Sequence, residues 1–152
     1  MSDSYLFDTS SPRFGLPLLF SGQSQKEAFV NEALSLTDAL LHCSVEGEAA
    51  APPGSPADGE NWLVGASASG DWLGQDGAIA CRQRGNWLFV PPTDGMRVLN
   101  RSTGQELNYL GGWRAPDAPD SPADGATIDA EARTAIAELI AALRVAGIFA
   151  LS

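Results

Sequence analysis

AIACRQRGNWLFV, the sequence of residues 78–90, predicts two short strands joined by a tight turn. The segments 78–83 and 86–90 are rich in apolar side chains, and Arg84 and Gly85 lie between them. Glycine readily adopts the positive φ that a two-residue hairpin turn requires. This stretch therefore predicts an antiparallel β-hairpin.

The same pattern continues on both sides of the hairpin, between Asn61 and Trp113. Short apolar runs are bounded there by Gly, Asp and Asn, which favour turns over regular structure. Together with the hairpin, these runs predict a small antiparallel sheet or barrel of about five strands, at 62–65, 78–83, 86–90, 96–100 and 106–110.

An amphipathic helix is predicted before the strands. Ser24 and Glu27 have the spacing of a capping box, in which two side chains satisfy free amide groups at a helix start. The helix should extend to about Cys43, with an apolar face of the kind that normally packs on a core. That face repeats at three- and four-residue steps and consists of Phe29, Ala33, Leu34, Thr37, Leu40 and Leu41.

Residues 1–23 are expected to form an extended arm, because Pro12 and Pro17 interrupt any helix there. The end of the arm is apolar, and large apolar side chains in a row need cover. We expect the body of the chain or a neighbouring subunit to cover this end, at Leu16, Leu18, Leu19 and Phe20.

The C-terminal part predicts a second helix after a linker. Three prolines make residues 115–126 an extended linker, and in the following segment, 127–147, Asp129 can cap a helix that Gly147 ends. Apolar residues from Ala132 to Ala146 repeat at 4-3-4-3 spacing, which is typical of helices that associate. We therefore expect contacts between copies of the chain, or with a fibre partner, at Ile136, Leu139, Ile140 and Leu143.

These elements predict an α+β fold with four parts. An N-terminal arm, 1–23, precedes an amphipathic helix and a small antiparallel β-rich domain within 24–114; the linker 115–126 and the oligomerisation helix within 127–147 follow.

Composition and charge argue against several classes of partner. The chain has 19 acidic and 9 basic residues, a net charge of -10, which repels nucleic-acid backbones. Its apolar stretches are too short or too interrupted to cross a bilayer, so no membrane insertion is expected. Cys43 and Cys81 form no CxxC pair, and no signal peptide is recognisable, so we expect synthesis in the cytoplasm.

Enzyme motifs are missing from the sequence. There is no GxSxG elbow, no GxxxxGK phosphate loop, no HExxH and no GxGxxG. The histidine His42 stands alone, and Asp58, Asp76, Asp94 and Asp124 each precede a glycine, as turns require. The sequence therefore predicts no catalytic residues, no metal site and no cofactor.

Trp72, Trp87 and Trp113 each follow a glycine at a predicted turn, at Gly70, Gly85 and Gly112. Such a turn can seat a large ring in the core or between subunits, where aromatic side chains dominate burial. It can also expose the ring as a platform for a sugar or a partner protein. Both interpretations stay open at this stage.

The N-terminal sequence resembles an uncharacterised family found in alphaproteobacterial prophages and gene transfer agents. The resemblance rests first on GLPLLFSGQSQKE at 15–27, continued by NEAL at 31–34 and DAL at 38–40. It extends over residues 15–114, through landmarks at 52–59, 62–65, 70–72, 77–80, 85–89 and 95–98.

The resemblance implies a virion component: a head spike or a tail fibre that attaches to the polysaccharide capsule of a recipient cell. Such a protein would be a homo-oligomer, trimeric or pentameric, assembled with capsid or other fibre proteins on the exterior of a phage-like particle. Members of the family often carry further receptor-binding regions, which favours a base or connector role for this shorter chain. The alternative is a carbohydrate-binding module that contacts capsule through Trp72, Trp87 or Trp113. A third and less favoured class is an enzyme that cleaves polysaccharide with two carboxylates.

Overall fold

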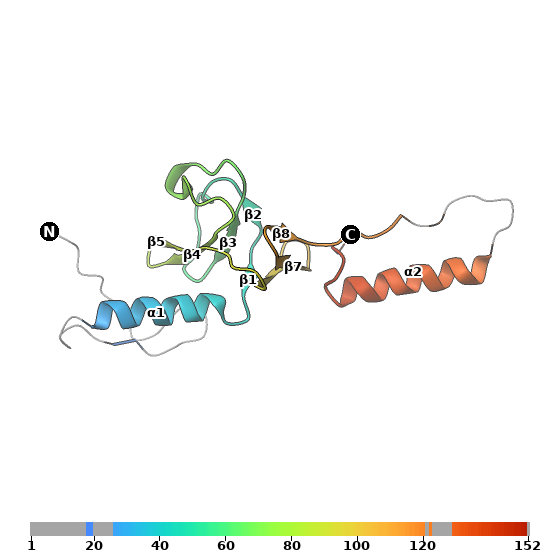
Figure 1. The fold of residues 1–152 in the computed structure, drawn as a ribbon, viewed down its shortest axis with the longest axis horizontal. Helices are drawn as coiled ribbons and strands as arrows, with labels where there is room; N and C mark the ends of the chain where they lie inside the picture. Colours follow the sequence, from blue (N-terminus) through green and yellow to red (C-terminus); the bar gives the residue numbers. More distant parts are fainter. Residues whose placement is uncertain (1–17, 20–25, 121, 123–128, 152) are drawn as a thin grey trace. The chain divides into compact units, whose positions relative to one another are not determined.

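The computed structural model describes residues 18–19, 26–120, 122 and 129–151. It divides the chain into two compact units, Met1–Pro92 and Thr93–Ser152 (Figure 1). The described part of the chain contains two α-helices and eight short strands, so the predicted α+β class is confirmed.

The first unit contains a four-stranded sheet in the order β2-β3-β4-β5. Its strands are β2 (Glu48–Ala49), β3 (Asn61–Val64), β4 (Ile79–Gln83) and β5 (Asn86–Val90), and a two-residue strand, β1 (Ser44–Val45), precedes them. The predicted hairpin is confirmed, since β4 and β5 pair in register from Gln83–Asn86 to Ile79–Val90. Both turn residues have positive φ, 49° at Arg84 and 76° at Gly85. β2 pairs with β3 in parallel, a departure from the predicted antiparallel arrangement.

Helix α1 (Glu27–Leu40) packs on one face of this sheet through polar residues. Its buried residues are Asn31, Ser35, Asp38 and Ala39, whereas Phe29 on the predicted apolar face is 78% exposed. The predicted apolar face is therefore not the face that α1 buries. Helix α1 begins without a side-chain cap at Lys26, and Ser24 of the predicted capping box lies outside the described residues.

Hydrogen bonds explain why α1 turns its polar face inward. Gln83 Nε2 of β4 donates to Ser35 Oγ at 2.7 Å, and Ser35 Oγ donates to the Asn31 carbonyl at 2.8 Å. Asn61 Nδ2 of β3 donates to the Ala39 carbonyl at 3.1 Å, near the C-terminal end of α1. A buried polar group without a partner costs about 1–3 kcal/mol. The amides that this face of the sheet presents therefore require polar partners, which an apolar helix face lacks.

The opposite face of the sheet carries the core of the first unit. Trp72, in the short 3-10 helix η1 (Gly70–Trp72), is fully buried and packs with Val64, Ala68 and Ala80. Gly70 enters this turn with φ of 61°, a conformation that other residues rarely adopt. The partly buried side chains around this cluster are Ala49, Trp62, Trp87 and Phe89.

The second unit combines antiparallel strands with helix α2. β6 (Arg97–Asn100) pairs with β7 (Gln105–Tyr109), which pairs with β8 (Trp113–Arg114). α2 (Ala130–Val145) follows residues without regular structure, as predicted for the linker where it is described. Both predicted helix ends are confirmed: the Asp129 carboxylate accepts from the Ala132 N–H at 2.9 Å, and Gly147 has φ of 72°.

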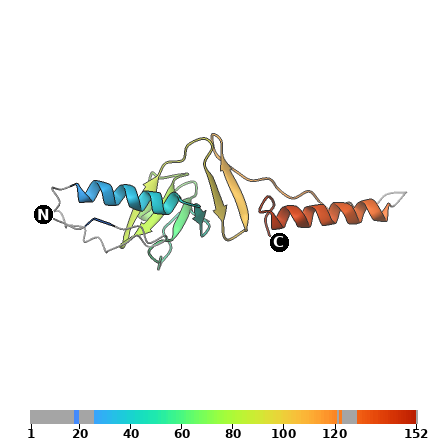
Figure 2. The same cartoon turned by 90° about the horizontal axis from the view of Figure 1, so that it is seen from below.

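Contacts with β7 fix the C-terminal end of α2 (Figure 2). The Glu106 N–H donates to the Gly147 carbonyl at 2.7 Å, and Gln105 Nε2 donates to the Ile148 carbonyl at 2.8 Å. One turn further, the Leu151 N–H donates to the Thr103 carbonyl at 2.7 Å. The residues after α2 therefore fold back onto the strands. The composition of the linker did not predict this contact.

Candidate functional site

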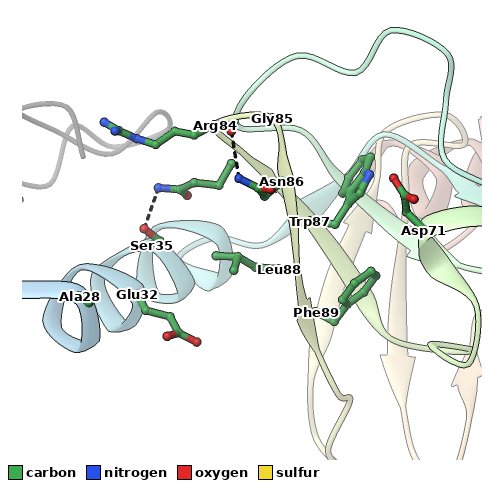
Figure 3. Close-up of a pocket in the computed structure, with 11 residues that line it drawn as sticks. Ala28, Glu32, Ser35, Asp71, Arg84, Gly85, Asn86, Trp87, Leu88 and Phe89 are labelled. Atoms are coloured by element: carbon green, nitrogen blue, oxygen red, sulfur yellow. Dashed lines mark hydrogen bonds between the residues drawn. The ribbon is translucent and has the colours of Figure 1, made fainter. Parts of the chain in front are cut away.

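A cleft of about 540 Å³ lies at the outer edge of β5 (Figure 3). Residues of both faces of β5 line it: Leu88 points toward α1, and Trp87 and Phe89 point to the other side. Because one cavity meets both faces of the strand, it must run along the edge between them. We call this cavity the β5 cleft; its full lining is Ala28, Glu32, Ser35, Asp71, Gln83, Arg84, Gly85, Asn86, Trp87, Leu88 and Phe89.

The walls of the β5 cleft come from elements that pack on opposite faces of the sheet. α1 supplies Ala28, Glu32 and Ser35 on one side, and η1 supplies Asp71 on the other. Each wall thus carries one carboxylate: Glu32 in the α1 wall and Asp71 in the η1 wall. The floor combines the apolar side chains of β5 with the amides of Gln83 and Asn86.

Trp87 is the one residue of the three predicted tryptophans that lines the cleft. Its ring meets the Trp72 ring edge to face, with centroids 5.1 Å apart and planes at 83°. The Arg82 guanidinium lies 5.0 Å from the centroid of the Trp87 ring, within cation–π range. Trp87 is therefore held firmly by the core while part of its ring remains accessible.

The other two tryptophans are placed differently. Trp72 is fully buried, so its ring offers no surface to a ligand, and its placement fits the core-packing interpretation. Trp113 belongs to the second unit, where it is half-buried and meets the Tyr109 ring with centroids 5.2 Å apart. Of the three rings, the structure thus brings Trp72 and Trp87 into contact within the first unit.

The predicted contact residues of the arm are described only in part. Leu18 is buried and Leu19 is half-buried, whereas Leu16 and Phe20 lie outside the described residues. The Asn31 side chain holds the main chain of Leu19: the Leu19 N–H donates to Asn31 Oδ1 and Asn31 Nδ2 donates to the Leu19 carbonyl, both at 2.8 Å. At this point the arm packs on its own chain. For Leu16 and Phe20, cover remains a prediction.

The four predicted contact residues of α2 differ in burial. Ile140 is buried, at 8% exposure, and Leu143 is half-buried. Ile136 and Leu139 are 40% and 59% exposed. The stripe that the sequence predicts is thus on one helix, and among the described residues its N-terminal half, Ile136 and Leu139, is only partly covered.

The β5 cleft itself was missed by sequence reasoning. Periodicity identified β5 as a strand but could not show that it lies at the edge of the sheet, which depends on pairing far along the chain. The one local signal is Pro91-Pro92 directly after the strand, since proline is common beside edge strands.

The described ranges contain no group of three or more His, Cys, Asp or Glu side chains placed to hold a metal ion. Neither of the two helices there has the length and apolar character needed to cross a membrane.

Comparison with known proteins assigns the chain to a family. A search of curated proteins found no match. A family model described as a protein of unknown function, DUF2793, matches residues 30–114, which is more than half of the chain. The matched range contains most of α1, all of the strands and nearly all of the β5 cleft, and it stops before α2. The chain therefore belongs to the DUF2793 family of proteins of unknown function.

Proposed function

We propose that this chain is a non-enzymatic structural component of a phage-like particle, the base or connector of a head spike or fibre. It would support attachment to the recipient cell without carrying out chemistry. The observation that carries the proposal is the exposure of two apolar side chains of the α2 stripe, Ile136 and Leu139. The sequence resemblance to prophage and gene transfer agent proteins supplies the particle as its setting.

The stripe of α2 supports self-association because the helix is poorly covered by its own unit. α2 has 16 residues, and only Ile140 among them is buried. Isolated helices of this length are marginal in water, so most of their stability comes from packing. The contacts with β7 hold the C-terminal end of α2 and leave Ile136 and Leu139 exposed. Copies of α2 around a symmetry axis would cover this stripe, in a trimer or a pentamer.

The experiment weighs the protein in solution by light scattering. We expect a trimer or pentamer for the unchanged protein, and a monomer after Ile136→Asp and Leu139→Asp are combined. Ala141→Asp is the matched control, because Ala141 is exposed on the other side of the same helix; this variant should keep the oligomer. An unchanged protein that stays monomeric even at the highest concentration it reaches in solution, or an oligomer that survives the double substitution, would refute the self-association on which the proposal depends.

A second candidate is a carbohydrate-binding module, which the lining of the β5 cleft favours. Sugar sites combine aromatic faces with amide and carboxylate groups, and the cleft offers Trp87 with the Asn86 amide and, on the same side of the strand, Asp71. Capsular polysaccharide binding that is lost in Trp87→Ala and kept in Trp113→Ala would favour this function. Absence of binding by the folded oligomer would leave the structural role as the better supported one.

A further inference from the structure

β5 is an edge strand with unused main-chain groups. Arg82 of β4 directs both of its main-chain groups toward the β3 side: its N–H donates to the Glu60 carbonyl, and its carbonyl accepts from the Gly59 N–H. Trp87 is opposite Arg82, and Phe89 is opposite Ala80, two residues further along. In an antiparallel ladder these pairs exchange no hydrogen bonds, so the N–H and C=O of Trp87 and Phe89 point away from β4.

No hydrogen bond in the described ranges uses these outward groups of Trp87 and Phe89. Proteins usually protect a sheet edge with lysine, proline, a bulge or a very short strand. β5 has five residues, pairs without a bulge, and contains neither lysine nor proline. With respect to the residues that the structure describes, its edge is therefore open to a further strand over the length from Asn86 to Val90.

The shape of the β5 cleft favours one added segment over a second sheet. α1 and η1 form walls on the two sides of the edge, so the edge is recessed between them. A second copy would carry the same walls, which would meet before its β5 could reach this one. A single extended segment has no such walls and can lie in the recess.

The walls also indicate the chemistry of the segment. Side chains of an added strand point alternately to the two faces of the sheet. Those opposite Trp87 and Phe89 would meet the two rings and Asp71, and the one opposite Leu88 would meet Ala28 and Glu32. The cleft lining holds two carboxylates, Glu32 and Asp71, against one guanidinium, Arg84, and the chain has a net charge of -10, which together favour basic side chains among aliphatic ones.

We propose that the outer edge of β5 binds an extended, basic and aliphatic segment of a partner protein by strand addition. Main-chain hydrogen bonds to Trp87 and Phe89 would hold the segment, and the two walls would select its side chains. This site lies in the first unit and does not depend on the association of α2.

The probe is a fluorescent peptide of alternating lysine and valine, acetyl-Lys-Val-Lys-Val-Lys-amide, with binding followed by fluorescence anisotropy. We expect saturable binding, at least about tenfold weaker when both valines are N-methylated, because methylation removes donors that the edge carbonyls accept. A peptide with glutamate in place of lysine should also bind about tenfold more weakly, because its charged side chains, which alternate with the valines, would face the Glu32 carboxylate. No binding of the lysine peptide, or equal binding of its methylated or glutamate form, would overturn the proposal.

Protein variants provide an independent check. Phe89→Pro removes an outward N–H and leaves the donors of Leu88 and Val90 that pair with β4. It should weaken binding more than Phe89→Ala, which removes the ring but keeps the N–H; equal effects would contradict a main-chain role for Phe89. Thermal unfolding shows whether each variant is folded, and the methylated peptide tests the same bond on the unchanged protein.

The double variant Ile136→Asp, Leu139→Asp should keep full peptide binding, which separates this site from the function proposed for α2.

Discussion

Replacing Asn31 by alanine should destabilise the first unit by about 2–3 kcal/mol. Asn31 is fully buried, and its side chain makes two hydrogen bonds of 2.8 Å with the main chain of Leu19. Each bond contributes about 1 kcal/mol net, and alanine leaves the two main-chain groups of Leu19 without these partners in a partly buried place. For a domain of this size such a loss lowers the midpoint of thermal unfolding by roughly 10 °C.

The assay follows thermal and urea unfolding by tryptophan fluorescence in a Trp113→Phe background. Its remaining tryptophans, Trp62, Trp72 and Trp87, then report on the first unit alone. Thr37→Ala is the control on the same helix, because the Thr37 hydroxyl bonds only its own helix at an exposed position; its effect should stay within about 0.5 kcal/mol. If Asn31→Ala unfolds like the Thr37→Ala control, the polar packing of α1 does not contribute as we reason.

Three further predictions test other parts of the fold. Phe29→Ser should change stability by less than about 0.5 kcal/mol in the same urea unfolding assay, because Phe29 is exposed; a loss of about 3 kcal/mol would place its ring in a core instead. Trp72→Ala should cost about 3–5 kcal/mol or prevent folding, against a smaller loss for half-buried Trp113→Ala, as measured by circular dichroism during heating. Gly85→Ala should lower stability by about 1–2 kcal/mol, since φ is 76° there, and an unchanged midpoint would contradict this turn.

Local signals made the hairpin and the ends of α2 predictable. The turn at Arg84 and Gly85 lies within the stretch it connects, and the cap at Asp129 and the stop at Gly147 act within one helical turn of their own helix. Such features depend on residues near each other in the sequence. They need no knowledge of the rest of the fold.

The orientation of α1 was not predictable in this way. Its apolar pattern is typical of a helix that buries its apolar face, and nothing within residues 26–41 contradicts that. The deciding contact joins Ser35 to Gln83, 48 residues further along the chain. The edge position of β5 and the parallel pairing of Glu48 with Leu63 have the same cause, because each depends on which distant strands become neighbours.

Both α1 and α2 leave large apolar side chains exposed: Phe29 on α1, and Ile136 and Leu139 on α2. Apolar side chains that the units do not bury stay in contact with water until an assembly covers them, and contiguous apolar surface often marks an interface. Because Ile136 and Leu139 are 40% and 59% exposed, covering the rest of each side chain would contribute about 0.6–1.8 kcal/mol before ordering costs are subtracted. Two such side chains per chain give a weak association on their own. An oligomer held by α2 should therefore dissociate on dilution as a free protein, and persist where a particle holds several copies close together, since proximity raises the effective concentration of each helix for its neighbours.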